Sequence, residues 1–534
     1  MSKRISRLLV LIFVLTLATA ALPAKQVARV PPSQRASVAS SASRNAAIVA
    51  ATTEVLKETS EIRELPILRP VKSGAQSRTE IERMLIKNLN EEMTPADMHA
   101  AEVALRKFGL APREFEYRPF IIKLLTEQVA GYYDPKMREF HLADWLELEG
   151  QKPVMAHELT HALQDQHFNL RRFEKWPHGD SDAELAVHAL IEGDATLAMT
   201  IYMAKNPMVA LAFSRTLATG VATEQFNQAP RAMRESLIFP YMQGLEWATI
   251  LYRRGGWTMV SNAFTKLPLS SEQILHPEKY FNYERPVKVV LPDLTALLNA
   301  SAADVQRSVG TVGIRPVPGT AGVSPASTLN AQQSASKTQQ LPGTAGVSPA
   351  SGRTKPSSRR PTTNRPLSKS PLPTANRPLP TATWHRIDSD INGEWTYYLI
   401  LDQFLNSPAE SRRAAAGWAG DRYTLYEGPN GQVFLAQVAL WDTENDAREF
   451  FDAYVKRTGL RYPGAKRLDS SDSEPETRNS KLETANAQPE TRSTYSWATS
   501  EGSVVIELRG LRVVILEGLP EGVNGNTVLK ALWQ

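Results

Sequence analysis

The stretch "MAHELTHALQDQHF", residues 155–168, contains two histidines four residues apart, His157 and His161, with Glu158 directly after the first. The surrounding residues lack Gly and Pro after Pro153, so the stretch is predicted to be helical. Four helical residues turn the chain about 40° beyond a full turn, which puts both imidazoles on one face. The pair predicts chelation of one metal ion, and Glu158 is the expected general base.

A third ligand is needed, and His167 is one alternative. It follows His161 by six residues, the spacing of the pattern HExxHxxGxxH. That pattern requires a Gly where the chain leaves the helix, and this chain has Gln164 there. If the helix continues, His167 lies about 240° around from His161 and points away from the metal. His167 is therefore the alternative metal ligand.

The preferred third ligand comes from "SDAELAVHALIEGDATLAMTIYMA", residues 181–204, an apolar segment predicted to be a buried helix. Glu184, His188 and Glu192 recur every four residues on it and form one polar stripe. Buried carboxylates need partners, and a metal ion is a strong one. Glu184 is explained by a predicted capping box that starts at Ser181. Glu192 has no such explanation and is the expected third ligand.

Other polar residues are candidates to orient the ligands or to stabilise a transition state. Asp165 lies one turn beyond His161 and is expected to orient that imidazole. The remaining candidates for such roles are His188, Asp194 and His276. The oxyanion of a tetrahedral intermediate also needs a donor, for which the sequence offers Tyr132, Tyr133, His188, Tyr241 and His276.

"AHELTHALQDQHF" followed by "ALIEGDAT" resembles the arrangement of gluzincin metallopeptidases, HExxH plus a distant Glu. "VAGYYDP" and "SSEQILHPEKY" are also similar to uncharacterised secreted bacterial members of that group. The resemblance covers about residues 80–290 and implies that His157, His161 and Glu192 hold Zn²⁺, with Glu158 as the base. The thermolysin-like pattern has an Asp four residues after the ligand Glu, whereas this chain has Thr196, which leaves the orienting group of the imidazoles open.

The order of composition and motifs predicts an α+β fold in two folded parts. The expected segments are a signal peptide (1–20), a low-complexity leader or propeptide (21–75), a mostly helical zincin-like domain (76–298), a basic Pro/Ser/Thr-rich linker in which "PGTAGVSPAS" occurs twice (299–383), and a C-terminal α+β domain with an antiparallel sheet and a polar insertion near 467–494 (384–534).

Composition excludes several classes of function. The chain has no cysteine, which rules out disulfides and thiolate metal sites. Eleven of its basic residues lie between positions 305 and 387, where there is no acidic residue, so the net charge of +5 belongs to the linker and no nucleic-acid partner is expected. The apolar run at 8–17 is too short to span a bilayer, so no stable membrane insertion is expected after cleavage.

The sequence thus predicts a secreted or periplasmic zinc-dependent metallopeptidase that acts on a peptide or protein substrate. The strand expected at "EFHLAD" would border the cleft and accept an extended peptide as a further strand. The alternative is a zincin-fold protein that binds envelope or protein partners with little or no catalysis. The intact Glu158 favours the enzyme. No feature of the sequence fixes the oligomeric state.

Overall fold

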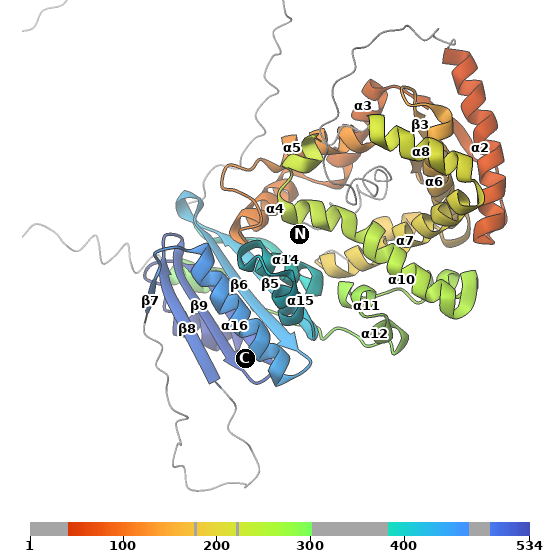
Figure 1. The fold of residues 1–534 in the computed structure, drawn as a ribbon. Helices are drawn as coiled ribbons and strands as arrows, with labels where there is room; N and C mark the ends of the chain where they lie inside the picture. The colour runs from red at the N-terminus through yellow and green to blue at the C-terminus, as the bar shows by residue number, and fades with distance from the viewer. Residues whose placement is uncertain (1–40, 176–178, 221–223, 302–382, 469–491) are drawn as a thin grey trace, which may run out of the picture. The chain divides into compact units, whose positions relative to one another are not determined.

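The computed structural model describes residues 41–175, 179–220, 224–301, 383–468 and 492–534, and the fold is mixed α+β (Figure 1). The helices before residue 300 include α2 (Ser41–Arg63), α3 (Arg78–Glu92), α4 (Pro95–Lys107), α5 (Tyr117–Gln128), α6 (Leu148–Phe168), η1 (Leu170–Lys175), α7 (Ser181–Lys205), α8 (Pro207–Gly220), α9 (Glu224–Gln228), α10 (Arg231–Ala263), α11 (Ser271–Leu275) and α12 (Pro277–Phe281). The later ones are α14 (Gly393–Leu405), α15 (Pro408–Ala415), η2 (Pro429–Gly431), α16 (Glu444–Arg461) and α17 (Gly525–Leu532). The strands are β1 (Lys72–Gln76), β2 (Gly131–Asp134), β3 (Glu139–Ala143), β4 (His385–Asp390), β5 (Trp418–Glu427), β6 (Val433–Trp441), β7 (Lys466–Leu468), β8 (Arg492–Thr499), β9 (Gly502–Arg509) and β10 (Arg512–Leu519).

Three long helices, α6, α7 and α10, form the centre of the helical region. The backbones of α7 and α10 meet at two glycines. A Cβ atom on Gly193 would lie 2.2 Å from the carbonyl oxygen of Gly244, and one on Gly244 would lie 2.3 Å from that of Ala189. Only glycine permits this approach. The contact places the residue before Gly193, which is Glu192, in the interior.

The folded part begins earlier than the sequence suggested, because α2 lies inside the segment expected to be a low-complexity leader. Ile48, Val55 and Ile62 are buried along one side of α2, which packs against α6 and α7. The spacing of these residues is close to helical periodicity, but the Ala- and Ser-rich composition around them obscured it. The predicted signal peptide at 1–20 lies outside the described residues.

A small sheet beside α6 has the strand order β1-β3-β2. The strand β3, which contains "EFHLA", pairs with β1 in parallel and with β2 in antiparallel orientation. The expectation that this strand lies at the edge is therefore wrong, because both of its sides are already hydrogen-bonded. The edge strand next to α6 is β2.

The C-terminal region contains an antiparallel seven-stranded sheet in the order β4-β5-β6-β10-β9-β8-β7, as the prediction of an α+β fold with an antiparallel sheet requires. Strands β6, β9 and β10 are rich in Val, Ile and Leu, which suits buried strands. The helices α14 and α16 pack against the sheet. Most of the predicted polar insertion, and the linker from 302 to 382, lie outside the described residues.

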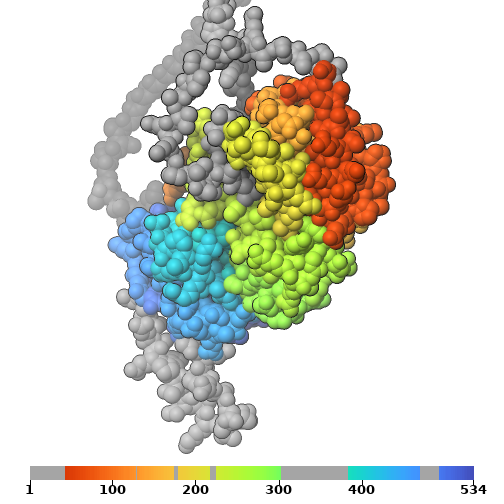
Figure 2. All heavy atoms as spheres, turned by 45° about the vertical axis from the view of Figure 1, so that its right-hand side comes forward, coloured from red at the N-terminus to blue at the C-terminus, as the bar shows by residue number. Residues whose placement is uncertain are grey.

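The helical region and the C-terminal sheet share a continuous core. In Figure 2 the cyan residues around β4, α14 and β5 lie directly against the green residues of α10 to α12. Polar contacts also join them: the Ser181 amide donates to Asp390 at 2.9 Å, and Arg457 donates to the carbonyl of Phe108 at 2.7 Å. Within the described residues, every helix is too short or too polar to cross a membrane.

Candidate metal centre

The helix α6 presents His157 and His161 on one buried face, as the spacing predicts. Both imidazoles are about 1% exposed. Their Nε2 atoms lie 3.1 Å apart, and the rings meet edge to face with centroids separated by 4.7 Å. Tyr241 of α10 stacks on the outer side of His157, with ring centroids 6.0 Å apart. Two lone-pair-bearing nitrogens this close need a proton or a cation between them.

Glu192 of α7 completes the cluster. Its Oε2 atom lies 3.0 Å from His157 Nε2 and 3.5 Å from His161 Nε2. An ion bound tetrahedrally at about 2 Å from each ligand requires the ligands to be about 3.3 Å apart. The three distances in the cluster match that requirement. Among the described residues, these three form the group of His and acidic side chains that could hold a metal ion.

The polar atoms around the cluster favour a cation. The second oxygen of Glu192, Oε1, is buried and has no hydrogen-bond partner among the residues that the structure describes. Burial alone would raise the pKa of Glu192, but the two imidazoles lower it to about 2. Burial would also lower the pKa of His161, but Glu192 raises it to about 9. Without an ion, a proton on the imidazoles balances the carboxylate. A divalent cation can take the place of that proton.

The group that orients His161 is Gln164, which the sequence analysis treated only as a departure from another pattern. Its side-chain oxygen lies 2.8 Å from His161 Nδ1, and its amide nitrogen donates to the carbonyl of Ile191 at 3.0 Å and to Asp194 Oδ2 at 2.9 Å. Gln164 therefore fixes the imidazole and ties α6 to α7. The signal was its place three residues after His161, on the same helical face.

Asp194 contacts Gln164 and so reaches His161 through that side chain. Its other oxygen, Oδ1, accepts from Arg63 Nε at 2.5 Å, and both side chains are fully buried. The Arg63 guanidinium also lies 4.5 Å from the ring centroid of Trp257. Arg63 could not be found from the sequence because it lies in the segment expected to be a leader.

Asp165 does not orient His161, which corrects the expectation. Its Oδ2 accepts from Tyr133 Oη at 3.0 Å and from Arg69 at 2.8 Å, and its Oδ1 accepts from the Leu170 amide at 3.2 Å. The reason lies in the partners: His161 Nδ1 is already paired with Gln164, and Asp165 faces Tyr133 of β2 and Arg69 instead. Asp165 secures the C-terminal end of α6.

Glu158 lies in the interior beside the cluster, about 1% exposed. Its Oε2 accepts from the backbone amide of Tyr133 in the edge strand β2 at 2.9 Å. Burial raises the pKa of Glu158 to about 8, against the effects of His161 and the Tyr133 amide. Glu158 is thus a buried carboxylate with high proton affinity, held by one backbone donor.

Four other histidine and glutamate candidates lie in different surroundings. His167 is paired with the carbonyl of Pro66 at 2.8 Å and belongs to the exposed end of α6, so it is not the third ligand. His276 pairs with Glu394 of α14 at 2.9 Å. His188 is buried on α7 one turn before Glu192. Glu184 does not complete a capping box that starts at Ser181, because Asp180 caps α7 through the Ala183 amide.

Comparisons with known proteins reach only the C-terminal region. Residues 380–528 match the model of a family described as a domain of unknown function (DUF8575). No curated protein and no solved structure matches the chain. The matched segment includes the seven-stranded sheet and does not include the histidines of α6.

Proposed function

We propose that the chain is an exported zinc-dependent metallopeptidase in which His157, His161 and Glu192 hold the metal and Glu158 is the general base. The observation that carries the proposal is the convergence of His157 Nε2, His161 Nε2 and Glu192 Oε2 at distances that suit one tetrahedral ion. Two histidines and a carboxylate are a ligand set of catalytic zinc sites.

When bound, zinc supplies Lewis acidity, which activates water and polarises a carbonyl group. The residues of the chain supply the remaining functions. Glu158 accepts the proton of the attacking water and passes it to the leaving amine. The Tyr133 amide holds Glu158 in place during both transfers. Gln164 keeps His161 in the orientation that ligation requires.

A peptide substrate would bind along β2. The opposite side of β2 is occupied by β3, and the Tyr133 amide of β2 points toward Glu158. An extended peptide that lies along this strand would run past the metal cluster. This arrangement replaces the one expected from the sequence, in which β3 was the edge strand.

A second function is favoured by the depth of the cluster. The three ligands and Glu158 are each only about 1–2% exposed. A substrate needs access to the metal, whereas a metal that organises the fold of a binding protein does not. A zincin-fold protein that binds envelope or protein partners, with little or no catalysis, is therefore the second candidate.

The deciding experiment measures metal per chain by elemental analysis, on protein purified without added metal, together with cleavage of a peptide library. The variants are Glu192→Ala, Glu158→Gln and, as the matched control, His167→Ala. We expect about one zinc per chain in wild type, His167→Ala and Glu158→Gln, and none in Glu192→Ala. Cleavage by wild type that is lost in Glu158→Gln supports the peptidase. Metal without cleavage supports the binding protein, and absence of metal from wild type refutes both.

A further inference from the structure

A cavity of about 370 Å³ lies among helices other than α6. Its lining residues come from α10, from α11 and the start of α12, and from α14 and α15. These helices pack against one another, and Figure 1 shows α14 and α15 beside α11. The volume suits a small organic molecule.

Two neighbouring residues of the cavity wall have buried polar atoms with no partner among the described residues. Glu394 is 5% exposed, and its Oε1 pairs with His276 at 2.9 Å, but its Oε2 has no hydrogen-bond partner. The indole Nε1 of Trp395, which is also 5% exposed, has none either. An unsatisfied buried polar group costs about 1–3 kcal/mol, so a ligand that reached both atoms would gain free energy from each contact.

The charged residues at the bottom of the cavity differ from those at its rim. Glu394 is the buried carboxylate, whereas Arg412 and Arg413 of α15 are exposed at the rim, as is Glu246 of α10. The Arg412 guanidinium lies 4.6 Å from the ring centroid of Tyr398. Burial raises the pKa of Glu394, in keeping with a carboxylate whose second oxygen lacks a cation.

The rest of the lining is apolar. Ile250, Ile274, Leu275 and Pro277 contribute to it, and the ring of Trp395 packs between Phe239 and Tyr398 with centroid separations of 4.7 and 5.0 Å. A ligand that fills this space therefore needs an apolar portion as well as polar groups.

We propose that this cavity binds a free α-amino acid with an apolar side chain. The ammonium group donates to Glu394 Oε2, the carboxylate accepts from Trp395 Nε1 and faces Arg412, and the side chain packs against the apolar lining. A buried acceptor, a donor beside it and cations at the rim are complementary to a zwitterion. A simple organic amine would leave the indole donor and the guanidinium unpaired.

The test is calorimetric titration of the full chain with L-leucine, compared with N-acetyl-L-leucine and L-leucinamide. Acetylation removes the ammonium charge and amidation removes the carboxylate charge, so we expect each analogue to bind at least about tenfold more weakly. These ligand-side comparisons use the wild-type protein and do not depend on any variant folding.

Three variants locate the binding. Glu394→Gln and Trp395→Phe each remove one of the two polar partners and keep the shape, and we expect both to weaken L-leucine binding at least about tenfold. Glu192→Ala at the metal cluster is the matched control and should bind L-leucine as wild type does. Absence of L-leucine binding, equal binding by Glu394→Gln, or loss of binding in Glu192→Ala alone would each overturn the proposal. Equal binding of L-leucinamide and L-leucine would also overturn it, because it would identify the ligand as a simple amine.

Discussion

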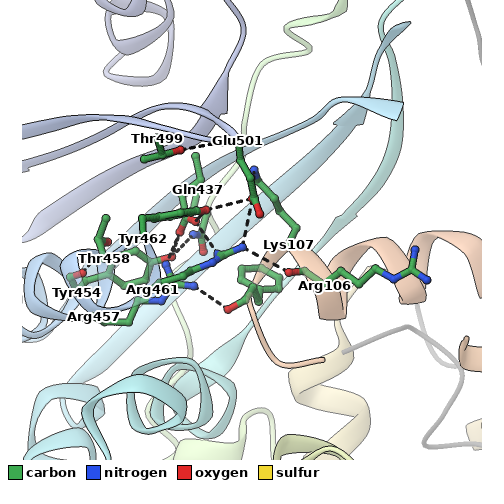
Figure 3. Close-up of polar contacts among 12 residues, drawn as sticks. Arg106, Lys107, Gln437, Tyr454, Arg457, Thr458, Arg461, Tyr462, Thr499 and Glu501 are labelled. Atoms are coloured by element: carbon green, nitrogen blue, oxygen red, sulfur yellow. Dashed lines mark hydrogen bonds and ion pairs between the residues drawn. The ribbon is translucent and has the colours of Figure 1, made fainter. Parts of the chain in front are cut away.

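Two buried carboxylates, Glu517 in the C-terminal sheet and Glu192 in the helical region, are surrounded in opposite ways. Glu517 Oε1 accepts from Tyr454 and Arg457 at 2.5 and 2.7 Å, and its Oε2 accepts from Arg461 and Tyr462 at 2.8 and 3.2 Å. Figure 3 shows these partners, which come from α16 and from Tyr462, the residue that follows it. Glu192, in contrast, has one oxygen near two imidazoles and another with no partner among the described residues.

The difference separates a structural cluster from a ligand site. Around Glu517, permanent cations and hydroxyl donors occupy both carboxylate oxygens, so no further ligand is needed. Around Glu192, the facing atoms are a carboxylate oxygen and two imidazole nitrogens, all of which have lone pairs to offer. Such a group is complete only when a proton or metal ion joins it.

The largest expected effect is on stability, from Glu517→Ala. The substitution leaves Arg457 buried without its carboxylate, and we expect a loss of about 3–5 kcal/mol in the free energy of unfolding. Glu192→Ala in metal-free protein is the matched control and should cost less than Glu517→Ala, because an imidazole can lose its proton and a guanidinium cannot. Denaturant unfolding in the presence of a chelator measures both. Equal losses in the two variants would remove the distinction between the clusters.

The next effect concerns the glycine that sets Glu192 in place. Gly193→Ala introduces a Cβ atom that would lie 2.2 Å from the Gly244 carbonyl oxygen, so α7 and α10 must separate. We expect a loss of about 1–3 kcal/mol in stability, together with weaker metal binding, because the neighbouring Glu192 shifts. Gly459→Ala on α16 is a control, since no atom lies within 4 Å of the added carbon. Metal binding unchanged in Gly193→Ala would show that the close contact does not position Glu192.

Gln164→Leu should weaken metal binding without removing a ligand. Loss of the contact with His161 Nδ1 is expected to lower zinc affinity by about 10- to 100-fold, which corresponds to about 1.4–2.7 kcal/mol. Competition with a chelating dye measures the affinity. The comparison is Asp165→Asn, which we expect to leave zinc affinity unchanged because Asp165 contacts Tyr133 and Arg69 instead. The reverse order of the two effects would restore Asp165 as the orienting group.

The last effect appears only in acid. Burial would raise the pKa of Glu517, but Arg457 and Arg461 lower it to about 2, from a usual value of 4.5. The stabilisation from this ionised group is present above the unfolded-state pKa of about 4.5 and is lost as the pH falls toward 2. Unfolding free energies measured from pH 6 down to pH 2 should fall more steeply in wild type than in Glu517→Gln. Parallel curves would contradict the assigned shift.

Much of the candidate site was accessible from local sequence. The helical spacing of His157 and His161 fixes their common face, and the apolar surroundings of Glu192 indicate that its carboxylate is buried. The sequence analysis assigned the orientation of His161 to Asp165, whereas Gln164 has that role. Both residues lie within about one turn of His161 on α6, so the local sequence could not separate them. Which of them meets the imidazole depends on where α7 packs.

The sequence alone determined the two-histidine helix, the buried helix of Glu192 and the antiparallel C-terminal strands, because each depends on periodicity within one segment. Only the tertiary structure decided that α2 belongs to the core, that Arg63 supports Asp194, that β2 rather than β3 borders α6, and that Glu394 and Trp395 share a cavity with His276. These arrangements join residues far apart in the chain. Their geometry follows from how whole helices and strands pack, which no local pattern encodes.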